Sequence, residues 1–126
     1  MPDDRFPVEV VQGVPVVTVP EEIDVTNAEG LRTALLHAAS NGHGTLVVDM
    51  TRTRFCDSAG LHALIGAHKR ARAEGRHLRL AVTGAQVRRI LALTAVDRLI
   101  PVCTSLGQTL TYPPAASTMA AREQDR

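Results

Sequence analysis

Apolar runs of two different periods alternate along this 126-residue chain and are separated by polar turns. Valine-rich runs at residues 8–11 and 14–19 flank Gln12-Gly13, which predicts a β-hairpin with a two-residue turn. Short apolar or alternating runs predict further strands at residues 45–49, 77–82 and 100–103. Apolar residues that recur three and four positions apart predict helices at residues 26–40, 58–74, 87–94 and 106–110.

Residues 45–74 pass from strand to helix and organise the rest of the chain. Residues 46–48 form an apolar run that ends at Asp49, as in a strand buried on both faces. Ser58 stands where the next helix should begin, and its hydroxyl could accept a hydrogen bond from the backbone N–H of residue 60 or 61. We therefore expect Ser58 to be the N-cap of this helix and Gly75 to end it. In the first helix, Thr26 and Glu29 have the spacing of a capping box.

The order of elements predicts an α/β protein with a single domain. A hairpin followed by alternating strands and helices gives a mixed sheet of four to five strands, in which the N-terminal hairpin joins parallel strands, packed against three to four helices. We expect residues 8–112 to form this domain, residues 1–7 to be a flexible N-terminus and residues 113–126 to be a disordered C-terminal tail.

Composition narrows the possible partners. Aromatic residues make up 2% of the chain and the net charge is +1, so neither a base-stacking platform nor an attraction to polyanions is indicated. Two cysteines, Cys56 and Cys103, lie in or beside apolar runs, which favours buried thiols in a reducing compartment over a zinc site. The chain has no signal-like start and no apolar run near 18 residues, so we expect a cytoplasmic protein without a membrane span.

The sequence argues against two other kinds of functional site, a hydrolase nucleophile and a phosphorylated aspartate. The segment from Cys56 to Gly60 has a serine at a strand-to-helix turn, but its first position is not the glycine of a nucleophile elbow. Asp49 ends a strand as the phosphorylated aspartate of a receiver domain does, but that family also needs an acidic pair after its first strand to bind magnesium, and Asp3-Asp4 precede the first strand here. No catalytic residue, cofactor or metal ligand is therefore expected, and a serine at a helix start is most often only a cap.

The stretch Thr45 to Glu74, with the strand Leu46-Val-Val-Asp49 and the run from Phe55 to Leu61, resembles the STAS domain of bacterial anti-sigma factor antagonists. The run Asp57-Ser58-Ala-Gly60-Leu61 after a hydrophobic strand carries the resemblance most specifically, and residues 23–28, 80–84 and 93–99 match in order and spacing. The resemblance covers about residues 8–110 and implies the same mixed sheet and helices. Glu21 and Ala95 stand where the family often has glycine, and both departures leave Ser58 untouched.

This resemblance implies a switch that exchanges partners by phosphorylation. The unphosphorylated protein would bind an anti-sigma factor that is a serine kinase, and so release a sigma factor. The kinase would phosphorylate Ser58 and break the complex, and a serine phosphatase would reset it. The phosphosite surroundings and partner surface would comprise Asp24, Thr26, Asn27, Asp57, Ala59, Gly60, Leu61 and His62.

Two alternatives stay open at this point. The chain is a STAS scaffold module of another signalling complex if Ser58 is only a helix cap. A small serine hydrolase would instead use Ser58 as its nucleophile, with a base from among the five histidines. The identities of the sigma factor, kinase and signal stay open, as does the oligomeric state.

Overall fold

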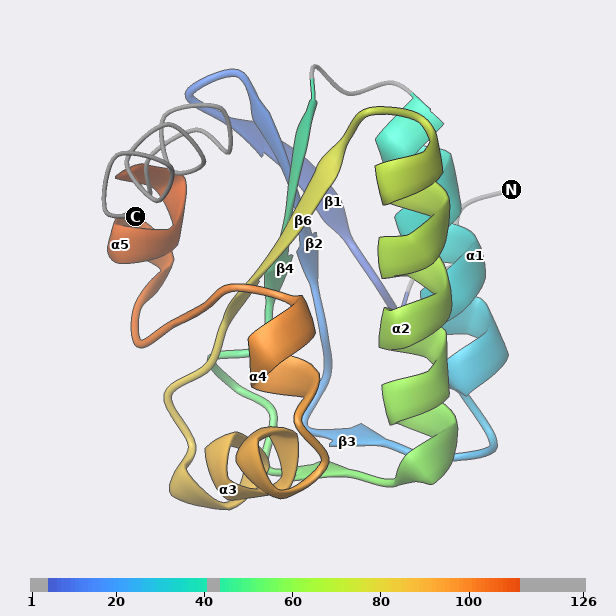
Figure 1. Cartoon of the computed structure of the whole chain (residues 1–126), viewed down its shortest axis with the longest axis vertical. Helices are drawn as coiled ribbons and strands as arrows, with labels where there is room; N and C mark the ends of the chain where they lie inside the picture. The colour runs from blue at the N-terminus through green and yellow to red at the C-terminus, as the bar shows by residue number, and fades with distance from the viewer. Residues whose placement is uncertain (1–4, 41–43, 112–126) are drawn as a thin grey trace, which may run out of the picture.

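The computed structural model describes residues 5–40 and 44–111, and these form a layered α/β structure (Figure 1). A five-stranded sheet has the order β1-β2-β4-β6-β7. Its strands are β1 (Val8–Val11), β2 (Val14–Thr18), β4 (Thr45–Asp49), β6 (His77–Ala81) and β7 (Val102–Cys103). A separate two-stranded sheet pairs β3 (Glu22–Ile23) with β5 (Phe55–Cys56). The helices are α1 (Ala28–Ser40), α2 (Ser58–Ala73), α3 (Ala85–Leu93), α4 (Val96–Leu99) and α5 (Leu106–Thr111).

The large sheet is mixed, as the sequence predicts. β1 and β2 are antiparallel, whereas β2, β4, β6 and β7 follow one another in parallel. The hairpin turn has positive φ at both central residues, 53° at Gln12 and 81° at Gly13. Positive φ at both positions is the mark of a type I′ turn, whose twist matches that of the two strands. The hairpin prediction is therefore confirmed, and β1 lies at one edge of the sheet.

The main core lies between the sheet and the helices α1 and α2, which run side by side over one face (Figure 1). α5 lies on the opposite side of the sheet. Alternate residues of β4 and β6, such as Val48 and Leu80, are fully buried and belong to the same core cluster as Leu35 and Leu64 of the two helices. Burial on both faces explains why β4 appears in the sequence as a continuous apolar run.

The C-terminal end of α2 is fixed by a glycine turn, as predicted. Gly75 has φ +75°, a conformation that costs glycine little. Its N–H donates to the Arg72 carbonyl at 3.1 Å, and the Arg76 N–H donates to the Ala71 carbonyl at 2.7 Å. These two bonds form a Schellman motif, which satisfies the last carbonyls of the helix and directs the chain into β6.

The structure adds features that the sequence did not indicate. Within the expected N-terminal segment 1–7, Phe6 is only 1% exposed, and the Thr18 N–H donates to the Pro7 carbonyl at 2.9 Å. The described residues contain five helices where three to four were expected, because Val96–Leu99, outside the helices expected from the sequence, form the single turn α4. The small sheet β3–β5 was not predicted at all. Residues 1–4 and the expected disordered tail, 113–126, lie outside the described residues.

Candidate functional site

The two-stranded sheet places the loop before α1 beside the turn that begins α2. β3 and β5 pair in parallel, with Ile23 opposite Cys56. The Asp57 N–H then donates to the Ile23 carbonyl at 3.1 Å, which extends the pairing by one residue. The segment that follows Ile23 therefore begins next to Asp57 and Ser58. This juxtaposition depends on four strand residues whose pairing leaves no strong periodic signal in the sequence.

Asp57, not Ser58, is the N-cap of α2, so the prediction of a capping serine is wrong. Asp57 has extended backbone angles (φ −91°, ψ −172°), and its Oδ1 accepts a hydrogen bond from the Gly60 N–H at 3.1 Å. Its carbonyl accepts from the Leu61 N–H at 3.0 Å, which is the first bond of the helix. Aspartate and serine cap helices about equally well, and the strand pairing of the preceding residue decides which of the two occupies the cap position.

Ser58 is consequently the first residue inside the helix, and its side chain is exposed. In the described part of the chain its hydroxyl makes no hydrogen bond. The N–H groups of the first helical residues have no acceptor within the helix, and the helix dipole places a partial positive charge there. The Ser58 position therefore combines an accessible hydroxyl with surroundings that tolerate a negative charge.

The loop before α1 is tied together by short-range hydrogen bonds. Thr26 donates to the Asp24 carboxylate from both its hydroxyl and its N–H, and these bonds lower the pKa of Asp24, the hydroxyl having the larger effect. Asn27 accepts from the Asp24 N–H and donates to the Glu22 carbonyl, each at 2.9 Å. The expected capping box is wrong because the Thr26 hydroxyl is used by Asp24, and α1 begins only after Asn27.

Gly60 allows α2 to approach the small sheet closely. A Cβ atom at this position would lie 2.5 Å from Cγ2 of Ile23 and 2.6 Å from Sγ of Cys56. Real Cβ atoms do not come so close, so any larger residue must displace the first turn of α2 from β3 and β5.

Burial raises the pKa of the Cys56 thiol to about 11, with a smaller contribution from Asp57, so this thiol stays protonated and unreactive. The expected burial applies to Cys56, whereas Cys103 is half-buried.

The remaining predicted site residues divide into core and surface. Leu61 is 8% exposed and packs into the core, Ala59 is half-buried, and His62 is exposed on α2. Sequence reasoning missed two exposed apolar side chains on the same segments, Phe55 at 47% and Val25 at 77% exposure. The sequence did contain a clue to both, since Phe55 lies three positions before Ser58 and Val25 directly follows Asp24. A large exposed apolar side chain beside a polar turn is typical of a contact surface.

The arrangement offers little to other chemistries. Within residues 5–40 and 44–111, no imidazole or carboxylate hydrogen-bonds the Ser58 hydroxyl, so a nucleophile–base pair is not assembled. No group of three or more potential ligating side chains gathers there to hold a metal ion. Over the same residues, no helix is both long enough and apolar enough to cross a membrane.

A family model for the STAS domain matches residues 5–109. The chain belongs to the STAS domain family. Among solved structures, this STAS domain is similar to an anti-sigma factor antagonist from Mycobacterium paratuberculosis, with 30% identity and a TM-score of 0.77 over 84% of this chain and 90% of the other. No match was found among curated proteins.

More distant structures share the fold of this STAS domain. A putative anti-sigma factor antagonist from Thermotoga maritima has 19% identity and a TM-score of 0.76, over 85% of this chain and 92% of the other. The anti-sigma factor antagonist SpoIIAA has 22% identity and a TM-score of 0.65 in its unphosphorylated form, over 79% and 88% of the two chains. The phosphorylated form of SpoIIAA from Bacillus gives 20% identity and a TM-score of 0.60, over 79% and 91%.

Proposed function

We propose that this STAS domain is an anti-sigma factor antagonist whose affinity for its partner is controlled by phosphorylation of Ser58. The unphosphorylated form binds an anti-sigma factor with serine kinase activity and thereby releases a sigma factor in the cytoplasm. A serine phosphatase restores this form. The phosphoryl transfer is carried out by the partner kinase, so the domain itself is not an enzyme.

The position of Ser58 is the observation that carries this proposal. The side chain is exposed, and Asp57 has taken over the capping bond that would have occupied its hydroxyl. A serine kept only for capping would accept a backbone N–H, and Ser58 does not. The likeness to the mycobacterial antagonist supports the same role, and SpoIIAA is a fold relative with solved phosphorylated and unphosphorylated forms.

The switch can be explained by charge alone. Phosphorylation adds about −1.5 to −2 charge at pH 7, and the N-terminus of α2 offsets about 0.3–1 kcal/mol of its cost. The fold should therefore persist. Asp57 and Asp24 already make this surface acidic, and Thr26 lowers the pKa of Asp24 so that it stays ionised. A partner surface fitted to a neutral hydroxyl then meets repulsion and desolvation.

The partner surface would have an apolar centre and a polar rim. Phe55 and Val25 are exposed enough to be covered by a partner, and His62 and Asn27 lie on the adjoining segments. Aromatic anchors contribute much of the binding energy in such interfaces. We place Asp24, Thr26, Asp57 and Ala59 at the rim. Gly60 and Leu61, which are buried, hold the turn in position.

A kinase assay tests this proposal directly. The domain is mixed with ATP and an anti-sigma kinase encoded in the same genome, and the modified residue is mapped by mass spectrometry. Ser58→Ala should abolish the modification, whereas Ser40→Ala, at an exposed serine at the end of α1, should leave it unchanged. Phosphate found elsewhere, with the kinase shown to be active on a control substrate, would contradict the proposal.

A further inference from the structure

His68 is a buried titratable group on the helix that carries Ser58. It belongs to the core-facing side of α2 together with Leu61, Leu64 and Ala71, and it is only 8% exposed. Its Nδ1 atom is buried and has no hydrogen-bond partner among the described residues. A neutral imidazole can be tolerated in this position, whereas a charged one would lack a compensating partner.

The charges around His68 also oppose its protonation. Burial is the largest cause that lowers the pKa of His68, and the cationic Arg72 on α2 and His77 at the start of β6 lower it further. The pKa of His77 is itself lowered by burial and by Arg72 and Arg79. The side chains of α2 and β6 that lower the pKa of His68, Arg72 and His77, are therefore basic, and neither is a carboxylate.

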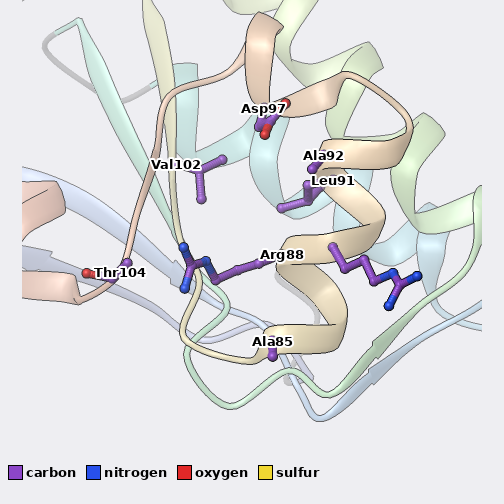
Figure 2. Close-up of a pocket in the computed structure, with 8 residues that line it drawn as sticks. Ala85, Arg88, Leu91, Ala92, Asp97, Val102 and Thr104 are labelled. Atoms are coloured by element: carbon purple, nitrogen blue, oxygen red, sulfur yellow. The ribbon is translucent and has the colours of Figure 1, made fainter.

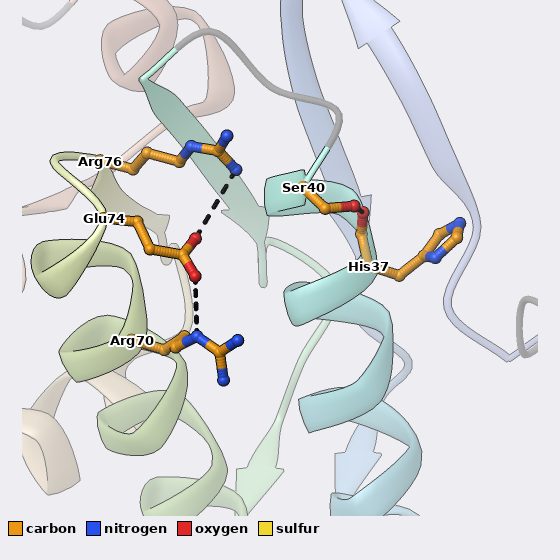
Figure 3. Close-up of polar contacts among 5 residues, drawn as sticks. All are labelled: His37, Ser40, Arg70, Glu74 and Arg76. Carbon is orange, nitrogen blue, oxygen red and sulfur yellow. Dashed lines mark hydrogen bonds and ion pairs between the residues drawn. The ribbon is translucent and has the colours of Figure 1, made fainter.

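The carboxylate at this end of α2 is already engaged. Glu74 Oε2 lies 2.8 Å from Arg70 Nε, and Oε1 lies 3.9 Å from a terminal nitrogen of Arg76 (Figure 3). Two arginines therefore share the Glu74 carboxylate. Glu74 does not contribute to the pKa of His68, whose causes are burial and cations alone.

α1, which packs along α2, does not supply a counter-charge either. Its charged side chains near the N-terminal end, Glu29 and Arg32, pair with each other at 3.8 Å. Near its C-terminal end, the exposed His37 points away from α2 (Figure 3). Among the described residues, α1, α2 and β6 thus offer a protonated His68 no carboxylate that is not already paired with an arginine.

We propose that His68 makes the packing of α2 sensitive to acid: a proton taken up by its imidazole places an uncompensated cation in the core and loosens the helix that carries the Ser58 turn. The folded state favours the neutral imidazole of His68, whereas the unfolded chain can carry the protonated imidazole in water. This inference concerns stability and does not depend on the proposed partner. In combination with the proposed function, the loosened α2 would lower the affinity of the antagonist for its partner at low pH.

The direction of the effect follows from proton linkage. The pKa of His68 is lower in the folded protein than the ordinary value of about 6.5 in the unfolded chain. The contribution of neutral His68 to the free energy of unfolding is therefore fully present above about pH 6.5. It is lost as the pH falls from there to the pKa that His68 has in the folded protein. In that window the equilibrium constant for unfolding rises by up to about tenfold per pH unit for this one proton.

Urea unfolding of the full chain at pH 7.5 and 5.5 tests the inference. His68→Leu keeps a buried apolar side chain and removes the titration, and His37→Leu makes the same change at an exposed histidine. When the pH falls from 7.5 to 5.5, the equilibrium constant for unfolding should rise more in the wild type than in His68→Leu. The difference between the two increases should be several-fold, up to about tenfold. His37→Leu should behave as the wild type does.

Equal pH dependence in His68→Leu and the wild type would overturn the inference. If His68→Leu does not fold, an NMR titration of the wild-type imidazole decides instead. A midpoint for His68 clearly below 6.5 supports the inference, and a midpoint at or above that value refutes it. A result in which His37→Leu alone loses the pH dependence would likewise refute it, since the sensitive group would then lie on the surface of α1.

Discussion

The Gly60→Ala substitution should destabilise the domain although alanine is the better helix former. The new Cβ would lie 2.5 Å from Ile23 Cγ2 and 2.6 Å from Cys56 Sγ, both in the buried contact between α2 and the small sheet. Overpacking of this kind typically costs about 1–3 kcal/mol. The gain in helix propensity is at most about 1 kcal/mol, and we therefore expect a net loss of up to about 2 kcal/mol.

α2 contains a matched control for this substitution. Gly66 lies in the same helix, and a Cβ there would meet only Arg32 Nε at 3.5 Å, an ordinary contact with a flexible side chain. Gly66→Ala should therefore stabilise the domain by about 0.5–1 kcal/mol. The two variants make the same chemical change, so an opposite sign isolates the close approach of Gly60.

Urea unfolding followed by far-UV circular dichroism measures both effects. A second variant, Cys56→Ala, removes one of the two atoms that the new methyl group would strike, so the double variant Gly60→Ala/Cys56→Ala should lose less than the sum of the single losses. Gly60→Ala as stable as the wild type, with Gly66→Ala behaving as expected, would refute the close approach and the position it gives to Ser58.

Three further predictions concern the same region and its surroundings. Asp57→Ala should lower the free energy of unfolding by about 1 kcal/mol, and Ser58→Ala by less than about 0.5 kcal/mol, in chemical denaturation; the reverse order would restore Ser58 as the cap. Ala95→Gly should stabilise the domain by up to about 1 kcal/mol in the same assay, because Ala95 has φ +63°. Asp24 has a lowered pKa, so its stabilising effect is present above about pH 4 and disappears as the pH falls through the folded value; between pH 5 and 2.5, Asp24→Asn should lose less stability than the wild type.

The large elements of the fold follow from local patterns. Period-two and period-3.6 runs located the hairpin, β4, α1, α2 and β6, because each buries one face or both against a neighbour. The glycine that ends α2 was identified because its positive φ is a local requirement. Such elements can be predicted from the sequence because the pattern that determines them is local.

The site depended on contacts that local patterns do not contain. The choice of Asp57 over Ser58 as N-cap is made by the pairing of Ile23 with Cys56, a contact between distant segments. A strand of two residues carries no periodicity, so β3 and β5 could not be predicted. The exposure of Phe55 follows from the same pairing, since Cys56 is the residue turned inward.

A cavity in another part of the molecule shows the same limit. About 480 Å³ of space lies between α3, α4 and β7. Figure 2 shows Arg88 extending from α3 toward Thr104, with Asp97 and Ala85 at opposite ends of the lining residues. The lining comes from α3, α4 and β7 and from Thr104 after β7, and α4 was not among the helices expected from the sequence. No periodic pattern unites these residues, so the cavity has no counterpart in the sequence.

The most direct test of the account compares the binding of two forms of the same protein. Domain carrying phosphoserine at position 58, and unmodified domain, are titrated into the partner anti-sigma factor by isothermal calorimetry, with circular dichroism confirming that both are folded. A loss of about 2–3 kcal/mol, which corresponds to an affinity about 30- to 150-fold weaker for the phosphorylated form, is the predicted result. Equal affinities of the two folded forms would contradict the central claim that charge at the exposed first residue of α2 controls the partner.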